Sequence, residues 1–325
     1  MVAAAASAPP LPIPLELGPS DPRLDAAEAE CLLLERLQAQ RGAVLAHIED
    51  AGAALLPTTA VRTAAGLQAA LRGLGVEPQP YTEGQSPRTR LLGQIYTSTN
   101  YPADAQIPLH HELSYRANPP ALLAFLCVQP ATTGGETPLL DGARFVEQAP
   151  AAVISAFRER TICYRKRMHG GFGLGKSWQA HFETADRAQV ERTLLEDGAT
   201  FGWTDDGGLW VEQLRPALQP HPRTGALCWR HQATLWHPSH LGAAGLRLRA
   251  AVGPDALPTD VRWADGAPID DALIAEARAA EWACASIRTW SAGDLLLVDN
   301  LRVAHGRAPF VGPRSVLVGM GGWPA

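Results

Sequence analysis

The segment IPLHHELSY at residues 107–115 is followed closely by the apolar run ALLAFLCV at residues 121–128, and together they indicate the core of the fold. In an extended strand, residues i and i+2 point to the same face. His110 and Glu112 would then project together, and His111 would point away. The apolar run has the length and composition of a buried strand. We therefore expect a strand that presents a His-x-Glu pair beside a strand of the core.

The His-x-Glu pattern alone is weakly diagnostic, because it occurs three times in the chain. The copy at His47 lies near the N-terminus without a partner motif, and the copy at His181 lies in a stretch without a clear strand signal. In isolation, such a pair is usually a surface pair with no chemical role. Only the copy at His110 precedes a strongly apolar run, and a further candidate ligand, His305, lies in the segment DNLRVAHGR at residues 299–307.

The three side chains of His110, Glu112 and His305 suit a particular metal chemistry. Two imidazoles and one carboxylate can hold one face of a metal ion and leave the opposite face open for a bidentate organic ligand and for dioxygen. This is the ligand set of non-haem Fe(II) oxygenases. Because Glu112 and His305 lie far apart in the chain, the fold must bring a late strand beside an early one, as a jelly roll does.

Further patterns place the other elements along the chain. Residues 295–298 and 315–320 read as strands. Four segments read as helices from their caps or apolar stripes, namely residues 21–40, 59–74, 186–197 and 270–286. We expect Asp21 to cap the first of these helices, with Pro22 as its first residue. In the third, Asp186 would cap the helix with Gln189 three residues later.

Bulk composition limits the possible classes of function. The chain has 325 residues, of which 46% are hydrophobic and 19% charged, so it can form a sizeable core. A net charge of −5 argues against generic nucleic-acid binding, and no apolar run is long enough to cross a membrane. The five cysteines form no Cys-x-x-Cys motif, which favours a reduced, cytoplasmic chain. We expect the Ala- and Pro-rich start to be a flexible tail and not a signal peptide.

Five segments together resemble a known family. They are SPR at residues 86–88, YTSTNYP at 96–102, IPLHHELSY at 107–115, GGETPLLD at 134–141, and the stretch 299–320. The chain resembles the TauD/TfdA-type 2-oxoglutarate-dependent dioxygenases from about residue 42 to residue 320. The first two segments resemble the branch typified by the syringomycin-biosynthesis hydroxylases. The motifs also occur in the family's order, which makes the resemblance specific.

The resemblance implies a fold more specific than the residue patterns do. It implies an α+β, mainly β chain with a distorted double-stranded β-helix, a cupin-like jelly roll buttressed by helices. The patterns alone predict only a mixed, strand-rich domain. We expect residues 1–20 to be the flexible tail and residues 21–325 to form a single dioxygenase domain. Within that domain, about residues 142–266 would be a long insertion that covers the mouth of the barrel.

The resemblance also implies the cofactors. His110, Glu112 and His305 would hold Fe(II), with 2-oxoglutarate and dioxygen as co-substrates and with succinate and carbon dioxide as products. Halogenating relatives replace the carboxylate ligand with a small residue. Because Glu112 is present, the chain is expected to transfer oxygen or to desaturate its substrate.

The distal carboxylate of 2-oxoglutarate needs a cation in fixed geometry. Arg314 is the first candidate, because a guanidinium group matches a carboxylate with two parallel hydrogen bonds. Taken alone, Arg314 would be read as a solvated surface arginine. Thr137 would add a hydroxyl donor. Arg307, two positions after His305, is the second choice for the cation, or else it forms a structural ion pair.

The expected substrate is a small molecule, namely an amino acid or a derivative of one, free or attached to a carrier protein, in specialised metabolism. Arg88 would bind its carboxylate away from the iron, and His169 would bond to its amine or to a polar side chain. We expect hydroxylation of an unactivated C–H bond. The carbon attacked and the oligomeric state stay open.

Two other functions are compatible with the same three metal ligands. The first is a zinc-dependent hydrolase that holds its metal through the same two histidines and one glutamate. The second is a barrel-type binding or sensor protein that keeps the ligands without turnover. Anaerobic metal binding with 2-oxoglutarate and the release of succinate separate these readings from an oxygenase.

Overall fold

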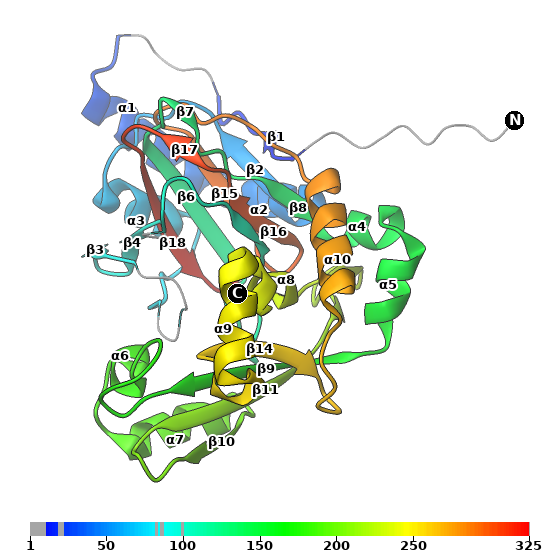
Figure 1. The fold of residues 1–325 in the computed structure, drawn as a ribbon. Coiled ribbons are helices and arrows are strands. Elements are labelled where there is room, and N and C mark those ends of the chain that lie inside the picture. The colour runs from blue at the N-terminus through cyan, green and yellow to red at the C-terminus, as the bar shows by residue number, and fades with distance from the viewer. Residues whose placement is uncertain (1–10, 19–22, 82–83, 85–87, 99–100, 325) are drawn as a thin grey trace, which may run out of the picture.

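The computed structural model describes residues 11–18, 23–81, 84, 88–98 and 101–324 (Figure 1). Most of the expected flexible tail lies outside these residues. So do Asp21, Pro22 and part of the SPR segment.

The largest sheet has seven strands in the order β1-β2-β15-β6-β18-β4-β3. These are β1 (Ile13–Pro14), β2 (Ala53–Leu56), β15 (Leu295–Asp299), β6 (Leu122–Gln129), β18 (Ser315–Gly321), β4 (Ile95–Thr97) and β3 (Arg90–Leu92). The apolar runs predicted as strands form β6, β15 and β18, so these predictions are confirmed. All three lie side by side in the middle of the sheet, with antiparallel pairing of β15 and β18 to β6.

Both faces of this sheet are buried, which explains why its central strands are apolar throughout. Leu122 and Leu126 pack into a cluster with side chains of the helices α1 (Ala26–Ala39), α2 (Arg41–Ala51) and α3 (Ala64–Gly73). Leu123 and Phe125 point to the opposite face and belong to the main core. Alternate residues of one strand therefore enter two different cores, and neither face is left for polar side chains.

A second, smaller sheet packs against that opposite face. It consists of β5 (Ile107–His110), β16 (Val303–Arg307) and β8 (Leu139–Asp141), with β16 in the middle. The short pair β7 (Thr133–Gly134) and β17 (Phe310–Val311) lies apart from it as a separate two-stranded sheet. Side chains of the smaller sheet and of the seven-stranded sheet share the main core. Two antiparallel layers around one core are the jelly-roll arrangement that was expected.

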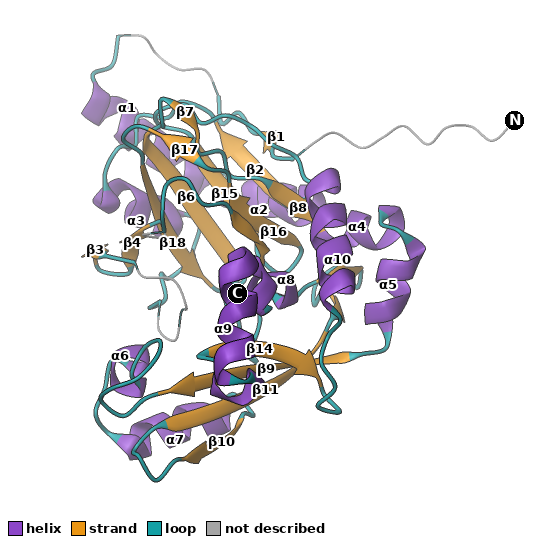
Figure 2. Cartoon of the chain, viewed as in Figure 1, coloured by secondary structure: helices purple, strands orange, loops and turns teal. Residues whose placement is uncertain are grey.

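The chain between β8 and β15 forms most of the remaining structure. Its helices are α4 (Gly142–Gln148), α5 (Ala151–Arg158), α6 (Trp178–Phe182), α7 (Arg187–Glu196), α8 (Ala233–Trp236), α9 (Gly242–Val252) and α10 (Asp271–Cys284), with 3-10 turns at Pro238–Leu241 and Pro254–Ala256. Its strands are β9 (Thr161–Met168), β10 (Thr200–Trp203), β11 (Leu209–Pro216), β12 (Leu218–Pro220), β13 (Leu227–Trp229) and β14 (Thr259–Trp263). The four-stranded sheet β10-β11-β9-β14 lies below the jelly roll in Figure 2.

The structure confirms two helix predictions and corrects the others. Residues 186–197 and 270–286 contain α7 and α10, each capped by the aspartate that precedes it. The first helix starts later than expected, because Asp25 caps it in a capping box with Glu28. Gln189 does not complete a capping box, since its side chain accepts a hydrogen bond from Thr184. The helix expected over residues 59–74 begins only after its cap, Thr63, and α2 was not predicted.

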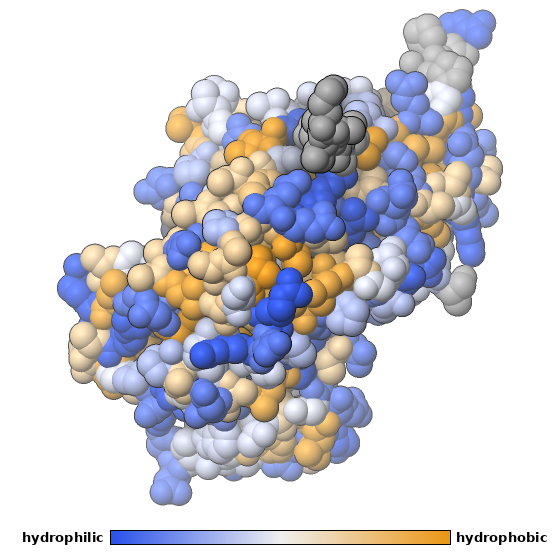
Figure 3. Space-filling model, turned by 90° about the vertical axis from the view of Figure 1, so that its right-hand side faces the viewer, coloured by the Kyte–Doolittle hydropathy of each residue, from blue (hydrophilic) through white to orange (hydrophobic). Residues whose placement is uncertain are grey.

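The exposed surface does not include the candidate metal ligands. Figure 3 shows that apolar residues gather between polar ones on the face that lies at the right of Figure 1, on the side of α4, α5 and α10. His110, Glu112 and His305 are all buried. Within the described residues, no helix combines the length and the apolar character needed to span a membrane.

The two-sided packing of β6 leads to a stability prediction. Leu126 is fully buried on the helix side of the sheet. Leu126→Ala should lower the free energy of unfolding by about 2–5 kcal/mol, because it leaves a cavity in a packed core. Urea unfolding measures this loss, and Mn(II) binding by the variant below its unfolding transition should be unchanged. Weaker Mn(II) binding in the folded variant would show that the helix side of the sheet affects the metal centre.

Candidate metal centre

His110 and His305 meet because β5 and β16 are antiparallel neighbours. The two histidines are direct register partners, and their ring centroids lie 4.4 Å apart. Residues that face each other in this way bring their side chains to the same side of the sheet. Phe125 of β6 packs against the His305 ring from the opposite layer, at a centroid distance of 5.1 Å. The two imidazoles are thus held by strand pairing and by the core.

Glu112 joins them from outside the strand. The expectation that Glu112 continues an extended strand is wrong, because β5 ends at His110 and a turn follows, in which Leu113 has a φ of 53°. The carboxylate nevertheless reaches the histidines, with Glu112 Oε2 lying 3.8 Å from His305 Nε2. One ligand atom from each of His110, Glu112 and His305 lies within 4.8 Å of the others.

The protonation of the two imidazoles fits a metal ligand set. His110 Nδ1 lies 2.8 Å from the Pro108 carbonyl and is its natural donor, which leaves Nε2 unprotonated for a metal. Burial lowers the pKa of His110, and it lowers the pKa of His305 to well below its ordinary value. Neutral imidazoles are the form that binds metal ions. Two such nitrogens and one carboxylate oxygen suit Fe(II).

Arg88 lies at this cluster. Its guanidinium group donates a hydrogen bond to Glu112 Oε2, and both side chains are almost completely buried. The guanidinium also lies over the ring of Tyr81, 4.3 Å from its centroid. The expectation that Arg88 lies away from the iron is therefore wrong, since it contacts the carboxylate ligand itself. Without a metal, this contact balances the charge of the buried carboxylate.

A narrow cavity adjoins the two histidines and brings together the residues expected to bind 2-oxoglutarate. Thr137, Arg307 and Arg314 line it together with His110 and His305. These residues come from the segment after β7, from β16 and from the residue before β18. The fold therefore collects them from three places in the chain beside the metal ligands.

Arg314 is held at this cavity by two hydrogen bonds. Its Nε donates to the Gly135 carbonyl at 2.9 Å, and its Nη1 donates to Ser98 Oγ at 3.2 Å. Burial, and to a lesser degree the nearby Arg307, lowers the pKa of Arg314 to about 10, so it stays charged at neutral pH. No described residue accepts a hydrogen bond from Nη2. A buried, oriented cation at a cavity is suited to bind a carboxylate.

Arg307 has a different set of partners. It donates to the carbonyls of Tyr101 at 3.1 Å and Ala105 at 2.7 Å, and also to the Pro102 carbonyl. These bonds tie the chain before β5 to β16. Thr137 also lines the cavity, and its hydroxyl oxygen accepts a hydrogen bond from Trp290 Nε1 at 3.2 Å.

His169 is not brought to the cluster. It follows β9, where its carbonyl accepts a hydrogen bond from the Trp178 amide at 3.2 Å. Among the described residues, no contact joins it to the metal ligands or to the cavity beside them. The histidines of the other two His-x-Glu copies are equally separate, since His47 lies on α2 and His181 on α6.

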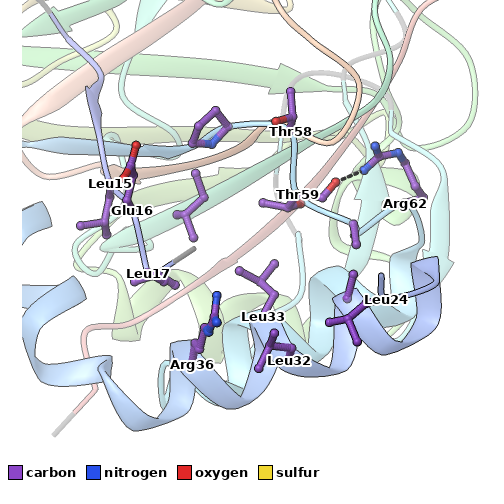
Figure 4. Close-up of a pocket in the computed structure, with 15 residues that line it drawn as sticks. Leu15, Glu16, Leu17, Leu24, Leu32, Leu33, Arg36, Thr58, Thr59 and Arg62 are labelled. Atoms are coloured by element: carbon purple, nitrogen blue, oxygen red, sulfur yellow. Dashed lines mark hydrogen bonds between the residues drawn. The ribbon is translucent and has the colours of Figure 1, made fainter. Parts of the chain in front are cut away.

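A wider groove lies elsewhere and lacks metal ligands of this kind. It lies between α1, the segment after β1 and the residues that follow β2, and its lining includes Leu32 and Leu33 of α1 and Leu15 and Leu17 after β1 (Figure 4). Its described lining contains the single carboxylate of Glu16 and no histidine or cysteine. The candidate chemistry therefore belongs to the narrower cavity.

Sequence reasoning missed several polar residues that support the cluster. Asn300 bonds to both peptide groups of Glu112, at 2.7 and 2.9 Å. Its neighbour Asp299 is paired with His221 at 2.9 Å, and both side chains are fully buried. Asn300 and Asp299 lie in the segment DNLRVAHGR that marks His305. Their place in this motif could have marked both residues as functional. It does not show that Asn300 contacts the backbone of Glu112.

Comparison with known proteins agrees with this geometry. The sequence pattern of the family described as "Taurine catabolism dioxygenase TauD, TfdA family" matches residues 17–320. The dapdiamide synthesis protein DdaC of Enterobacter agglomerans is 34% identical over 248 residues, which are 76% of this chain and 75% of that protein. A clavaminate synthase-like protein of Arabidopsis thaliana is 26% identical, over 89% of this chain and 87% of its own length.

Solved structures show the same fold. The PvcB protein of Pseudomonas aeruginosa superposes with a TM-score of 0.52 at 16% identity, covering 87% of this chain and 79% of that one. A taurine dioxygenase of Burkholderia xenovorans gives a TM-score of 0.50 at 14% identity, with the same coverage of both chains. The mixed α+β, cupin-like fold is thereby confirmed. The chain belongs to the TauD/TfdA family of non-haem dioxygenases that depend on Fe(II) and 2-oxoglutarate.

Proposed function

We propose that this dioxygenase hydroxylates an unactivated C–H bond of an amino acid or an amino-acid-derived substrate, free or carried by a protein, in specialised metabolism. The observation that supports it most is the buried His110, Glu112 and His305 cluster beside a cavity with a charged Arg314. The relative that is 34% identical is named for the synthesis of dapdiamide, which supports a biosynthetic role. The segments at residues 86–88 and 96–102, which resemble syringomycin-biosynthesis hydroxylases, also support a biosynthetic role.

Different residues of the chain have different roles in the reaction. When bound, iron with 2-oxoglutarate and dioxygen supplies the oxidising chemistry and releases succinate and carbon dioxide. His110, Glu112 and His305 hold the metal on one face. Arg314 binds and orients the distal carboxylate of 2-oxoglutarate, and Thr137 adds a hydroxyl. The apolar wall that includes Phe125 keeps water out of the site.

The segment of residues 142–266 is proposed to cover the mouth of the barrel within a single domain of residues 21–325. Contacts between this segment and the surroundings of the site support that role. Lys176 Nζ donates to the Gly84 carbonyl at 3.1 Å, close in sequence to Arg88. Asp197 Oδ1 accepts from the Ala117 amide at 2.6 Å, in the turn region that follows Glu112. Ordering of this segment around the substrate would exclude water.

Arg88 is proposed to bind the substrate carboxylate once iron has taken over the charge of Glu112. The Nε and Nη1 atoms of Arg88 are buried and have no hydrogen-bond partner among the described residues. These donors could therefore bind a carboxylate of the substrate. The cation lies beside His110 and His305 along the cavity wall. His169 is kept as a candidate for the substrate amine on sequence grounds, because no contact of this residue supports it further.

The first prediction concerns the metal ligands. His110→Ala, Glu112→Ala and His305→Ala should each abolish anaerobic binding of Fe(II) with 2-oxoglutarate, read as loss of the visible charge-transfer band of the chelate. Each should also stop succinate release, because one ligand of the open metal face is lost. His47→Ala and His181→Ala are matched controls and should keep the band. A ligand variant with the full band would remove that residue from the metal centre.

The second prediction concerns the co-substrate. Arg314→Ala should weaken 2-oxoglutarate binding by about 1.5–3 kcal/mol, or roughly ten- to a hundred-fold in apparent KM, because a charge-assisted contact is lost. Thr137→Val should have a smaller effect of the same kind. Arg307→Ala should mainly lower the free energy of unfolding, since its partners are backbone carbonyls. If Arg307→Ala destroys 2-oxoglutarate binding and Arg314→Ala does not, the two roles are reversed.

The third prediction concerns the substrate. Arg88→Ala should impair hydroxylation and leave iron and 2-oxoglutarate binding nearly intact, so succinate would form in excess of the hydroxylated product. The ratio of the two products, measured on a panel of amino acids and carrier-bound aminoacyl groups, tests this uncoupling. An unchanged ratio together with an unchanged substrate KM would make Arg88 structural.

A further inference from the structure

Glu112 differs from the other two metal ligands in what holds its backbone. His110 ends β5 and His305 lies within β16, and strand pairing fixes both. Glu112 lies two residues beyond the end of β5, and Leu113 after it has a left-handed backbone. The sheet therefore positions the two imidazoles but not the carboxylate ligand.

The Asn300 carboxamide holds this part of the chain. Its Oδ1 accepts a hydrogen bond from the Glu112 amide at 2.7 Å, and its Nδ2 donates to the Glu112 carbonyl at 2.9 Å. Nδ2 also donates to the Pro120 carbonyl at 2.7 Å. The Asn300 amide itself donates to the Ala121 carbonyl at 2.8 Å, just before β6. Asn300 is therefore bonded on both sides of the turn that follows Glu112.

The chemistry of the carboxamide explains why an asparagine suits this place. It carries one acceptor and one donor group, as a peptide unit does, so it can pair with both peptide groups of Glu112 as a neighbouring strand would. An aspartate lacks the donor and a serine is too short to reach both. Asn300 is 1% exposed, so water does not compete for these bonds. The contact with Asn300 uses only the peptide groups of Glu112, so Asn300 occupies neither oxygen of the carboxylate ligand.

We propose that Asn300 is a positioning residue for the iron site, which sets the backbone of Glu112 so that its carboxylate meets the two histidines. Asn300 touches neither the metal nor the substrate. The inference rests on Glu112 as an iron ligand and adds what places that ligand. It makes metal affinity depend on a side chain that is not itself a ligand, as is common for groups that orient ligands.

The test compares Mn(II) binding to the metal-free protein, followed by electron paramagnetic resonance of free Mn(II). Asn300→Ala should bind Mn(II) roughly ten- to a hundred-fold more weakly. Amide hydrogen exchange of the peptide containing Glu112 should become faster, and exchange of the β16 peptide should not change. Gln213→Ala is the matched control, because it removes a fully buried carboxamide whose partner is Asp197 and not a metal ligand. It should bind Mn(II) as the unaltered protein does.

A second variant keeps the test decisive if Asn300→Ala does not fold. Asn300→Asp keeps the size and the acceptor but loses both donated bonds, so its Mn(II) affinity should also fall. Unaltered Mn(II) affinity in whichever of the two variants folds would overturn the proposal. Glu112→Ala separates this failure from failure of the metal assignment. If Glu112→Ala still binds Mn(II) normally, Glu112 is not a ligand. If it does not, normal affinity in the Asn300 variants refutes the positioning role alone.

Discussion

The metal centre depends on the register between β5 and β16, in which His305 lies directly opposite His110. Side chains alternate between the two faces of a sheet, so a slip of one residue would turn His305 away from its partner. Leu109 of β5 and Val303 and Ala304 of β16 are buried in the main core, and their packing holds the strands in this register. The core that stabilises the jelly roll thus also determines the geometry of the two imidazoles.

The electrostatics of the cavity follow from an excess of cations. Arg88, Arg307 and Arg314 all line it, whereas Glu112 is the only carboxylate among the metal ligands. Each arginine has a different partner, since Arg88 bonds to Glu112, Arg307 bonds to three backbone carbonyls, and Arg314 bonds to neutral groups. Burying a cation beside neutral groups is costly without an anion. The excess of positive charge therefore suits the cavity to an anion, which agrees with the proposal that Arg314 binds the distal carboxylate of 2-oxoglutarate.

Local patterns predicted well wherever a local cause dominates. The apolar runs of β6, β15 and β18 were recognisable because both faces of those strands are buried. The aspartate caps of α7 and α10 were recognisable because capping is a contact between near neighbours in the chain. The start of α1 was misplaced because two aspartates were available, and the reciprocal bond with Glu28 decides in favour of Asp25. The position of Arg88 was also wrong, since its attraction to Glu112 acts across the fold.

The residue types in the sequence, together with the order of the family-like motifs, indicated His110, Glu112 and His305 as the metal ligands and indicated the family. Periodicity and composition also determined that the chain has an apolar, strand-rich core. How the backbone of the carboxylate ligand is held, and which partners each of the three arginines has, can be read only from the fold. Those outcomes depend on hydrogen bonds between residues nearly two hundred positions apart, such as Asn300 with Glu112, and no local pattern records such a contact. At a buried site, the role of a side chain depends on the groups that folding brings within hydrogen-bonding distance of it.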